Sequence, residues 1–161
     1  MELRQVAGPA VRVLLVQDST GHSTGYHVVA RALRDAGIEV VLGGALLPGQ
    51  IAQLAGEEGA DAIGYRIMDA APAILVARLA EALAAVGLAD IPVVVGGIVP
   101  QEDLGRLAAL GVARVFQPGA TFAEIADGFR AVGGAAAPGA SWDSTRARRS
   151  EWTFPRPESA T

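Results

Sequence analysis

Short apolar runs rich in Val and Ile recur along the chain and alternate with segments of helical periodicity. The runs cover residues 11–17, 38–43, 61–65 and 91–97, and a shorter fifth run covers 113–117. Their nearly continuous apolar character is typical of parallel strands that are covered on both faces. The pattern therefore predicts a sheet that is buried between two layers.

The segments between these runs carry apolar residues at helical spacing. In the first of them, Val29 and Leu33 fall on the side opposite Arg34, and Gly37 is placed to end the helix. Further helices are expected over residues 48–59, 70–87, 101–111 and 121–134. Thr121 and Glu124 have the spacing of a capping box at the start of the last helix.

Five repeats of strand and helix with short connections predict an α/β fold with a five-stranded parallel sheet flanked by helices. The commonest arrangement for five strands is the flavodoxin-like order 2-1-3-4-5. Such sheets bind ligands beyond the carboxyl ends of the strands, where the first and third strands diverge. Residues 18–25 and 66–70 meet there, and we expect 96–100 and 117–121 to line the same rim.

The character of the chain changes near residue 133. Residues 1–132 hold the α/β pattern, whereas 133–161 form an extended C-terminal tail rich in Ala, Gly, Pro and Ser. This tail contains Trp142 and Trp152, and purely disordered segments rarely carry such aromatic residues. We expect the tail to dock onto this domain or onto a partner.

Composition excludes several kinds of site. The chain has no cysteine, and all 13 basic residues are arginine, so thiolate sites, Schiff-base lysines and a Walker-type lysine are excluded. A net charge of −4 gives no basic excess for nucleic-acid binding. We expect no membrane span and no secretory signal in the N-terminal residues, and so a cytoplasmic location.

The loop after the first strand, "DSTGHSTGYH", gathers both histidines of the chain. It could simply turn the chain and cap the next helix through its glycines and hydroxyls. It could bind the phosphate of FMN at a helix start, with Tyr26 and Tyr65 as the aromatic residues available to the flavin ring. It could also offer His22 as a metal ligand, because a helix N-terminus favours the neutral imidazole.

From about residue 12 to 133 the sequence resembles the cobalamin-binding domain of adenosylcobalamin-dependent acyl-CoA mutases, of the methylmalonyl-CoA and isobutyryl-CoA mutase type. The similarity is carried by "GHSTGYHVVARALRDAGIEVV" and by "IPVVVGGIVPQEDLGRLAALGVARVFQPGATFAEIA". It implies a cobalamin-binding small subunit of a split isomerase, with a separate large barrel subunit as partner. His22 is then the lower axial cobalt ligand, and the residues expected to contact the cofactor are Thr20, Gly25, Gly96, Gly97, Pro118 and Gly119.

Two positions depart from the family pattern. The family's D-x-H-x-x-G signature has Thr20 where the carboxylate that orients the histidine is expected. The small hydroxyl residue of the family's S-x-L motif corresponds to Arg66, and an arginine there is expected to obstruct the slot for the nucleotide tail.

These departures leave a second hypothesis open, in which the domain no longer binds cobalamin. Its pocket would then bind another small molecule or catalyse acid–base chemistry without a cofactor. The candidate residues for that chemistry are His22, His27, Tyr65, Arg66 and Asp69. Besides a large subunit, a homo-oligomer and a small-molecule ligand stay open as partners.

Overall fold

The computed structural model describes residues 10–21, 23–135 and 153–154. The parallel strands are β1 (Arg12–Gln17), β2 (Glu39–Ala45), β3 (Ala62–Ile67), β4 (Val93–Gly97), β5 (Arg114–Phe116) and β6 (Thr153–Phe154). Their order in the sheet is β2-β1-β3-β4-β5-β6. The predicted five-strand order 2-1-3-4-5 is confirmed, and the short β6 extends the sheet beside β5.

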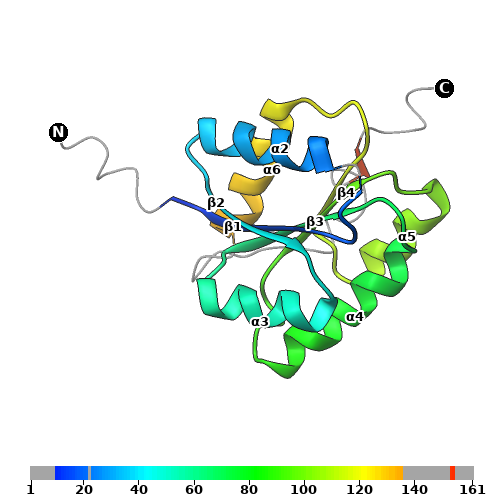
Figure 1. The fold of residues 1–161 in the computed structure, drawn as a ribbon. Helices are drawn as coiled ribbons and strands as arrows, with labels where there is room; N and C mark the ends of the chain where they lie inside the picture. Colours follow the sequence, from blue (N-terminus) through cyan, green and yellow to red (C-terminus); the bar gives the residue numbers. More distant parts are fainter. Residues whose placement is uncertain (1–9, 22, 136–152, 155–161) are drawn as a thin grey trace.

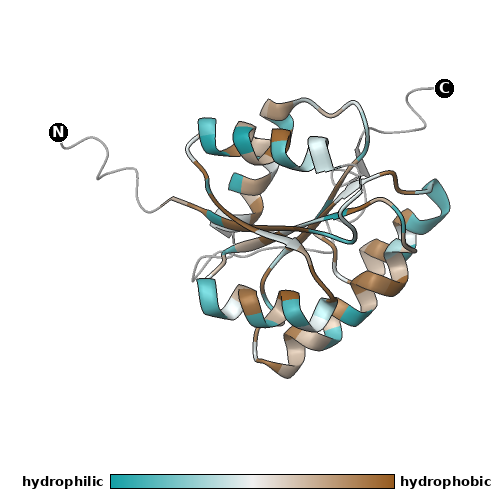
Figure 2. Cartoon of the chain, viewed as in Figure 1, coloured by the Kyte–Doolittle hydropathy of each residue, from teal (hydrophilic) through white to brown (hydrophobic). Residues whose placement is uncertain are grey.

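Helices cover both faces of this sheet (Figure 1). They are α2 (Ser23–Asp35), α3 (Pro48–Glu58), α4 (Pro72–Ala85), α5 (Gln101–Ala109) and α6 (Phe122–Ala135). One face packs against α2 and α6, and the other packs against α3, α4 and α5. Figure 2 shows hydrophobic residues along the central strands and hydrophilic residues on α2 and α3.

Each face of the sheet has its own core, because successive side chains of a strand point to opposite sides. Leu14 and Val16 belong to the cluster under α3, α4 and α5. Val13 and Leu15 belong to the cluster under α2 and α6. Burial on both sides explains why the strands are nearly continuous apolar runs in the sequence.

The helix ends follow the chemistry expected from the sequence. The Thr121 hydroxyl accepts a hydrogen bond from the Glu124 backbone N–H at 3.1 Å, and the Thr121 N–H donates to the Glu124 carboxylate at 2.8 Å. This confirms the predicted capping box at the start of α6. At the end of α3, Gly59 adopts φ 64°, a left-handed conformation that favours glycine.

A bulge in β2 fixes the position of α2. The pairing of β1 with β2 shifts between Leu15 and Val16, so that Gly44 rather than Gly43 lies opposite Val16. The Gly44 N–H donates to the Tyr26 hydroxyl at 2.9 Å, and that hydroxyl donates to the Leu15 carbonyl at 2.7 Å. Tyr26 therefore ties the first turns of α2 to both strands.

Of the tail, the structure describes residues 133–135, which form the end of α6, and the two residues of β6. Thr153 pairs with Val115 and Phe154 pairs with Phe116, which places these two residues at the edge of the sheet. Trp142 and Trp152 lie outside the described residues. Among the helices that the structure describes, none has the length and apolar character needed to cross a bilayer.

Candidate functional site

A cavity of about 390 Å³ lies between the sheet and the helices α2 and α6. Its interior is apolar, with Leu15, Val94, Phe116 and Phe129 contributing to its walls. The volume falls within the range of roughly 300–1,000 Å³ that is usual for small-molecule sites. The cavity reaches the loops that follow β3, β4 and β5, which is the edge predicted to bind a ligand.

Glycines make much of this cavity possible. The described residues that line it include Gly25, Gly64, Gly96, Gly97 and Gly119. A Cβ on Gly96 would have no neighbour closer than the Phe116 carbonyl oxygen at 3.9 Å. A side chain at this position would therefore extend into the open space rather than into the protein.

Gly97 has a different role. Its φ is 120°, and a Cβ there would lie 2.2 Å from the Ile67 carbonyl oxygen. The close approach of β4 to the end of β3 therefore requires glycine at this position. Gly97 also lines the cavity, so this close approach of the two strands lies at the cavity wall.

Gln117 holds two rim loops together. The Val99 N–H donates to Gln117 Oε1 at 3.1 Å, and Gln117 Nε2 donates to the Val99 carbonyl at 2.8 Å. The loop after β4 is thereby joined to the loop after β5, where Pro118 and Gly119 line the cavity. Residues 117–121 were predicted to line this rim, but the contact of Gln117 with Val99 was not predicted, because the two residues are adjacent only in the folded chain.

The loop after β1 is anchored through Asp18. Its carboxylate accepts hydrogen bonds from the backbone N–H groups of Met68, Asp69 and Ala70 at 3.1, 2.8 and 3.0 Å. The Ser19 hydroxyl donates to the Asp69 carboxylate at 2.6 Å. The loop that leads to position 22 is therefore fixed to the loop after β3.

His22 itself lies outside the described residues. On its N-terminal side, Thr20 is exposed, and its carbonyl accepts a hydrogen bond from the Ser23 hydroxyl at 3.2 Å. Because α2 begins at Ser23, position 22 directly precedes the helix. The assignment of His22 as a metal ligand stays a prediction.

Arg66 lies on the wall of the cavity, half-buried near the end of β3. One guanidinium nitrogen is 3.0 Å from the position that a Cβ on Gly25 would take. The arginine therefore lies against the first turn of α2. The expected obstruction is incomplete, because the cavity stays open beside this side chain.

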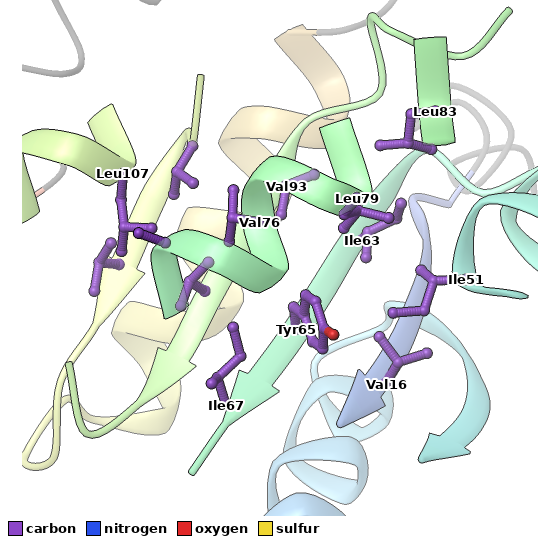
Figure 3. Packing of buried hydrophobic residues seen from close by; sticks show 14 of the residues in the cluster. Val16, Ile51, Ile63, Tyr65, Ile67, Val76, Leu79, Leu83, Val93 and Leu107 are labelled. Carbon is purple, nitrogen blue, oxygen red and sulfur yellow. The ribbon is translucent and has the colours of Figure 1, made fainter. Parts of the chain in front are cut away.

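The remaining candidates for acid–base chemistry are not gathered on one side of the sheet. Tyr65 contributes to the cavity wall, but its side chain packs in the cluster under α3 and α4, beside Ile63 and Val16 (Figure 3). His27 is exposed on α2 and contacts the edge of the Tyr26 ring. Asp69 is exposed and does not line the cavity.

The two tyrosines are also separated by the sheet. Tyr26 belongs to the cluster under α2 and α6, whereas Tyr65 belongs to the cluster on the opposite face. A flavin ring therefore has no position between them in this fold. Burial raises the pKa of Tyr26, and the hydrogen bond from Gly44 opposes that shift.

Comparison with known proteins adds an independent line of evidence. Residues 12–126 match the family described as the B12 binding domain. The pivalyl-CoA mutase small subunit of Xanthobacter autotrophicus is 45% identical over 115 residues, which cover 70% of this chain and 76% of that protein. The 2-hydroxyisobutanoyl-CoA mutase small subunit of Aquincola tertiaricarbonis is 35% identical over 107 residues, or 65% and 79% of the two chains.

Other similar proteins are larger or more distant. The probable methylmalonyl-CoA mutase large subunit of Mycobacterium tuberculosis is 36% identical over 74% of this chain but only 16% of its own length. A cobalamin-binding protein from Desulfitobacterium hafniense has a TM-score of 0.60 at 17% identity, covering 76% of this chain and 59% of that one. At that identity the structural match supports the fold alone.

Proposed function

The chain belongs to the B12 binding domain family, and from this premise we propose that it is the cobalamin-binding small subunit of an adenosylcobalamin-dependent acyl-CoA mutase. The observation that carries the proposal is the glycine-lined cavity between the sheet and the helices α2 and α6. It opens at the sheet edge where His22 precedes α2.

The residues present fit the nucleotide tail of cobalamin. The tail carries an aromatic base, and the cavity offers apolar walls that include Phe116 and Phe129. Gly96 leaves space where any other residue would project a side chain. These features describe a cradle for a flat, largely apolar group, and Arg66 narrows this cradle without filling it.

Within this proposal, His22 would coordinate the cobalt and the cavity would hold the nucleotide base. The bound cofactor supplies the radical that starts rearrangement of an acyl-CoA carbon skeleton. Gln117 and Asp18 hold the surrounding loops in place, and these loops would position the corrin. The acyl-CoA site belongs to the large subunit.

With Thr20 in place of a carboxylate, the imidazole of His22 lacks the charged hydrogen-bond partner that the family motif provides. A carboxylate at this position orients a metal-bound histidine, and losing such a partner typically costs about 10–100-fold in metal affinity or activity. The carboxylate of Asp18 is directed to the loop after β3, where its two oxygens accept three backbone hydrogen bonds. We therefore expect measurable but weakened ligation by His22.

A visible-absorption titration with hydroxocobalamin tests the proposal. The wild-type protein is expected to change the spectrum as histidine replaces the dimethylbenzimidazole base, and His22→Ala is expected to abolish the change. His27→Ala is the matched control, because it removes the other histidine of the chain and should keep the change. Thr20→Asp should tighten binding by about tenfold or more.

The proposal fails if the wild-type spectrum does not respond at high hydroxocobalamin concentration. If the spectrum of His22→Ala changes like that of the wild type, His22 is not the cobalt ligand. Circular dichroism of each variant checks that it has the same fold as the wild type.

A further inference from the structure

Arg66 introduces a charge into a wall that is otherwise uncharged. It is the only charged residue among the described residues that line the cavity. Alternation along β3 puts Arg66 on the same face as Ala62 and Gly64, which is the face that α2 and α6 cover. The charge therefore belongs to the cavity and not to the opposite core.

The position of the guanidinium depends on Gly25. Its nitrogen lies 3.0 Å from the place of a Cβ on that residue, so any other residue there would displace the guanidinium by a few tenths of an ångström. A half-buried guanidinium in apolar surroundings interacts more strongly with an anion than it would in water.

The cavity is thereby divided chemically into two parts. Its interior, with Leu15, Val94 and Phe129, suits an aromatic ring, and its wall near the end of β3 suits an anion. A nucleotide combines these two features in one molecule. The tail of cobalamin is such a group, since it joins an aromatic base to a ribose phosphodiester.

We propose that Arg66 recognises the phosphate of the cobalamin tail and makes this domain select corrinoids that carry a nucleotide. This inference rests on the proposed function, and it assigns a specificity role to the position where the family motif has a small hydroxyl residue. Arginine is suited to the task because its planar fork matches phosphate geometry.

The experiment compares two fragments of the tail, α-ribazole 3′-phosphate and the uncharged nucleoside α-ribazole, by isothermal titration calorimetry. The wild-type chain is expected to prefer the phosphate form by about ten- to a hundredfold. Arg66→Gln should reduce the preference to within about twofold, and Arg66→Lys should retain only part of it, because an ammonium group keeps the charge but not the planar fork. Raising the salt concentration should weaken the preference of the wild type.

Arg106→Gln is the matched control. Arg106 is exposed on α5, on the other side of the sheet, and does not line the cavity. This variant should keep the full preference. Hydroxocobalamin and cobinamide, which lacks the nucleotide, provide the same comparison with whole corrinoids.

The outcomes separate this inference from the proposed function. If hydroxocobalamin binds to the wild type but Arg66→Gln keeps its phosphate preference, the role of Arg66 is overturned and the proposed function stands. If Arg66→Gln binds the phosphate form more tightly than the wild type, Arg66 obstructs the cavity and the inference is likewise overturned. If the wild type binds no hydroxocobalamin, the proposed function falls and this inference falls with it.

Discussion

Asp18 shows how much of the site depends on a single side chain. Its carboxylate accepts hydrogen bonds from three consecutive backbone N–H groups, at residues 68–70. Hydrogen bonds to a charged group are stronger than neutral ones, and unsatisfied N–H groups carry a cost. Asp18 therefore links the loop before His22 to the loop after β3.

Replacing Asp18 with Ala should lower the free energy of unfolding by about 1–3 kcal/mol, because the three N–H groups lose their acceptor. Urea denaturation checks this expectation. Asp18→Asn keeps one acceptor oxygen and should have a smaller effect. Equal stability of Asp18→Ala and the wild type would show that water replaces the carboxylate fully.

Unlike Asp18, Tyr65 has a polar group that makes no hydrogen bond with the described residues. Its side chain is 1% exposed, and its hydroxyl has no hydrogen-bond partner among the described residues. Burial, assisted by the nearby charge of Asp18, raises the pKa of Tyr65 from 10.0 to about 12. Such a group is a poor proton donor near neutral pH, so the tyrosine is better explained as part of the core.

Alkaline titration tests this interpretation of Tyr65. A raised pKa in the folded state stabilises the protein fully below pH 10, and that contribution is lost as pH rises from 10 toward 12. The slope for one such group approaches about 1.4 kcal/mol per pH unit. Tyr65→Phe should remove most of this slope and leave stability near pH 7 unchanged within about 1 kcal/mol, because no hydrogen bond is lost.

Denaturant curves at several pH values between 8 and about 12 measure the slope. A slope that is the same in Tyr65→Phe and the wild type would contradict the shifted pKa. A large loss of stability near neutral pH would instead indicate that the hydroxyl has a partner.

The strand β4 connects the fold to the site. Val93 and Val95 pack in the core under α4 and α5, while Val94 and Gly96 line the cavity on the other face. A side chain at position 96 would occupy that cavity without contacting the protein closely. This strand therefore offers a way to fill the cavity and leave the core intact.

Gly96→Val should lower the affinity for hydroxocobalamin at least tenfold, because the valine side chain would occupy the part of the cavity that the nucleotide tail of the cofactor is proposed to fill. The melting temperature should not fall, since valine favours a strand and glycine does not. Gly105→Ala is the control, as a Cβ at that exposed α5 position meets nothing within 4 Å. Unchanged affinity in Gly96→Val would show that the tail binds elsewhere.

Most elements could be predicted because burial on both faces of the sheet leaves a strong signal. The strands begin and end within about two residues of the apolar runs. The end of β3 was missed, since the polar Arg66 interrupted the run although it belongs to the strand. The pairing of β6 was not predicted either, because a strand of two residues has no detectable period.

Because both faces of the sheet are buried, the sequence did not show on which face each candidate residue lies. Where both faces are apolar, alternation does not reveal which face a residue occupies. Tyr65 was therefore grouped with Arg66, although the two side chains lie on opposite faces. The roles of Gln117 and Asp18 depend on loops that are adjacent only after folding, and the sequence does not show these contacts.

At the scale of the whole molecule, exposed apolar side chains accompany the loops at the carboxyl edge of the sheet. Leu47, Ile74, Ile98 and Phe122 are each more than half exposed, at 69%, 53%, 62% and 51%. Each lies just after a strand or in the first turn of the following helix. We propose that this edge contacts the large mutase subunit.

The double substitution Leu47→Glu and Ile74→Glu should weaken association with the large subunit of the same organism at least tenfold. Neither residue lines the cavity, so hydroxocobalamin binding should be unaffected. Val86→Glu is the control, because Val86 is 53% exposed at the other end of α4. Analytical ultracentrifugation measures the complex, and an undiminished association in the double variant would place the interface elsewhere.

Electron paramagnetic resonance of cob(II)alamin bound to the ¹⁵N-labelled protein tests the central claim most directly. If His22 is the lower axial ligand, the nitrogen coupling should appear as a doublet from the labelled imidazole, and His22→Ala should lose it. A triplet from the unlabelled base of the cofactor would show that the base still binds cobalt. That result would contradict both the ligation by His22 and the placement of the base in the cavity.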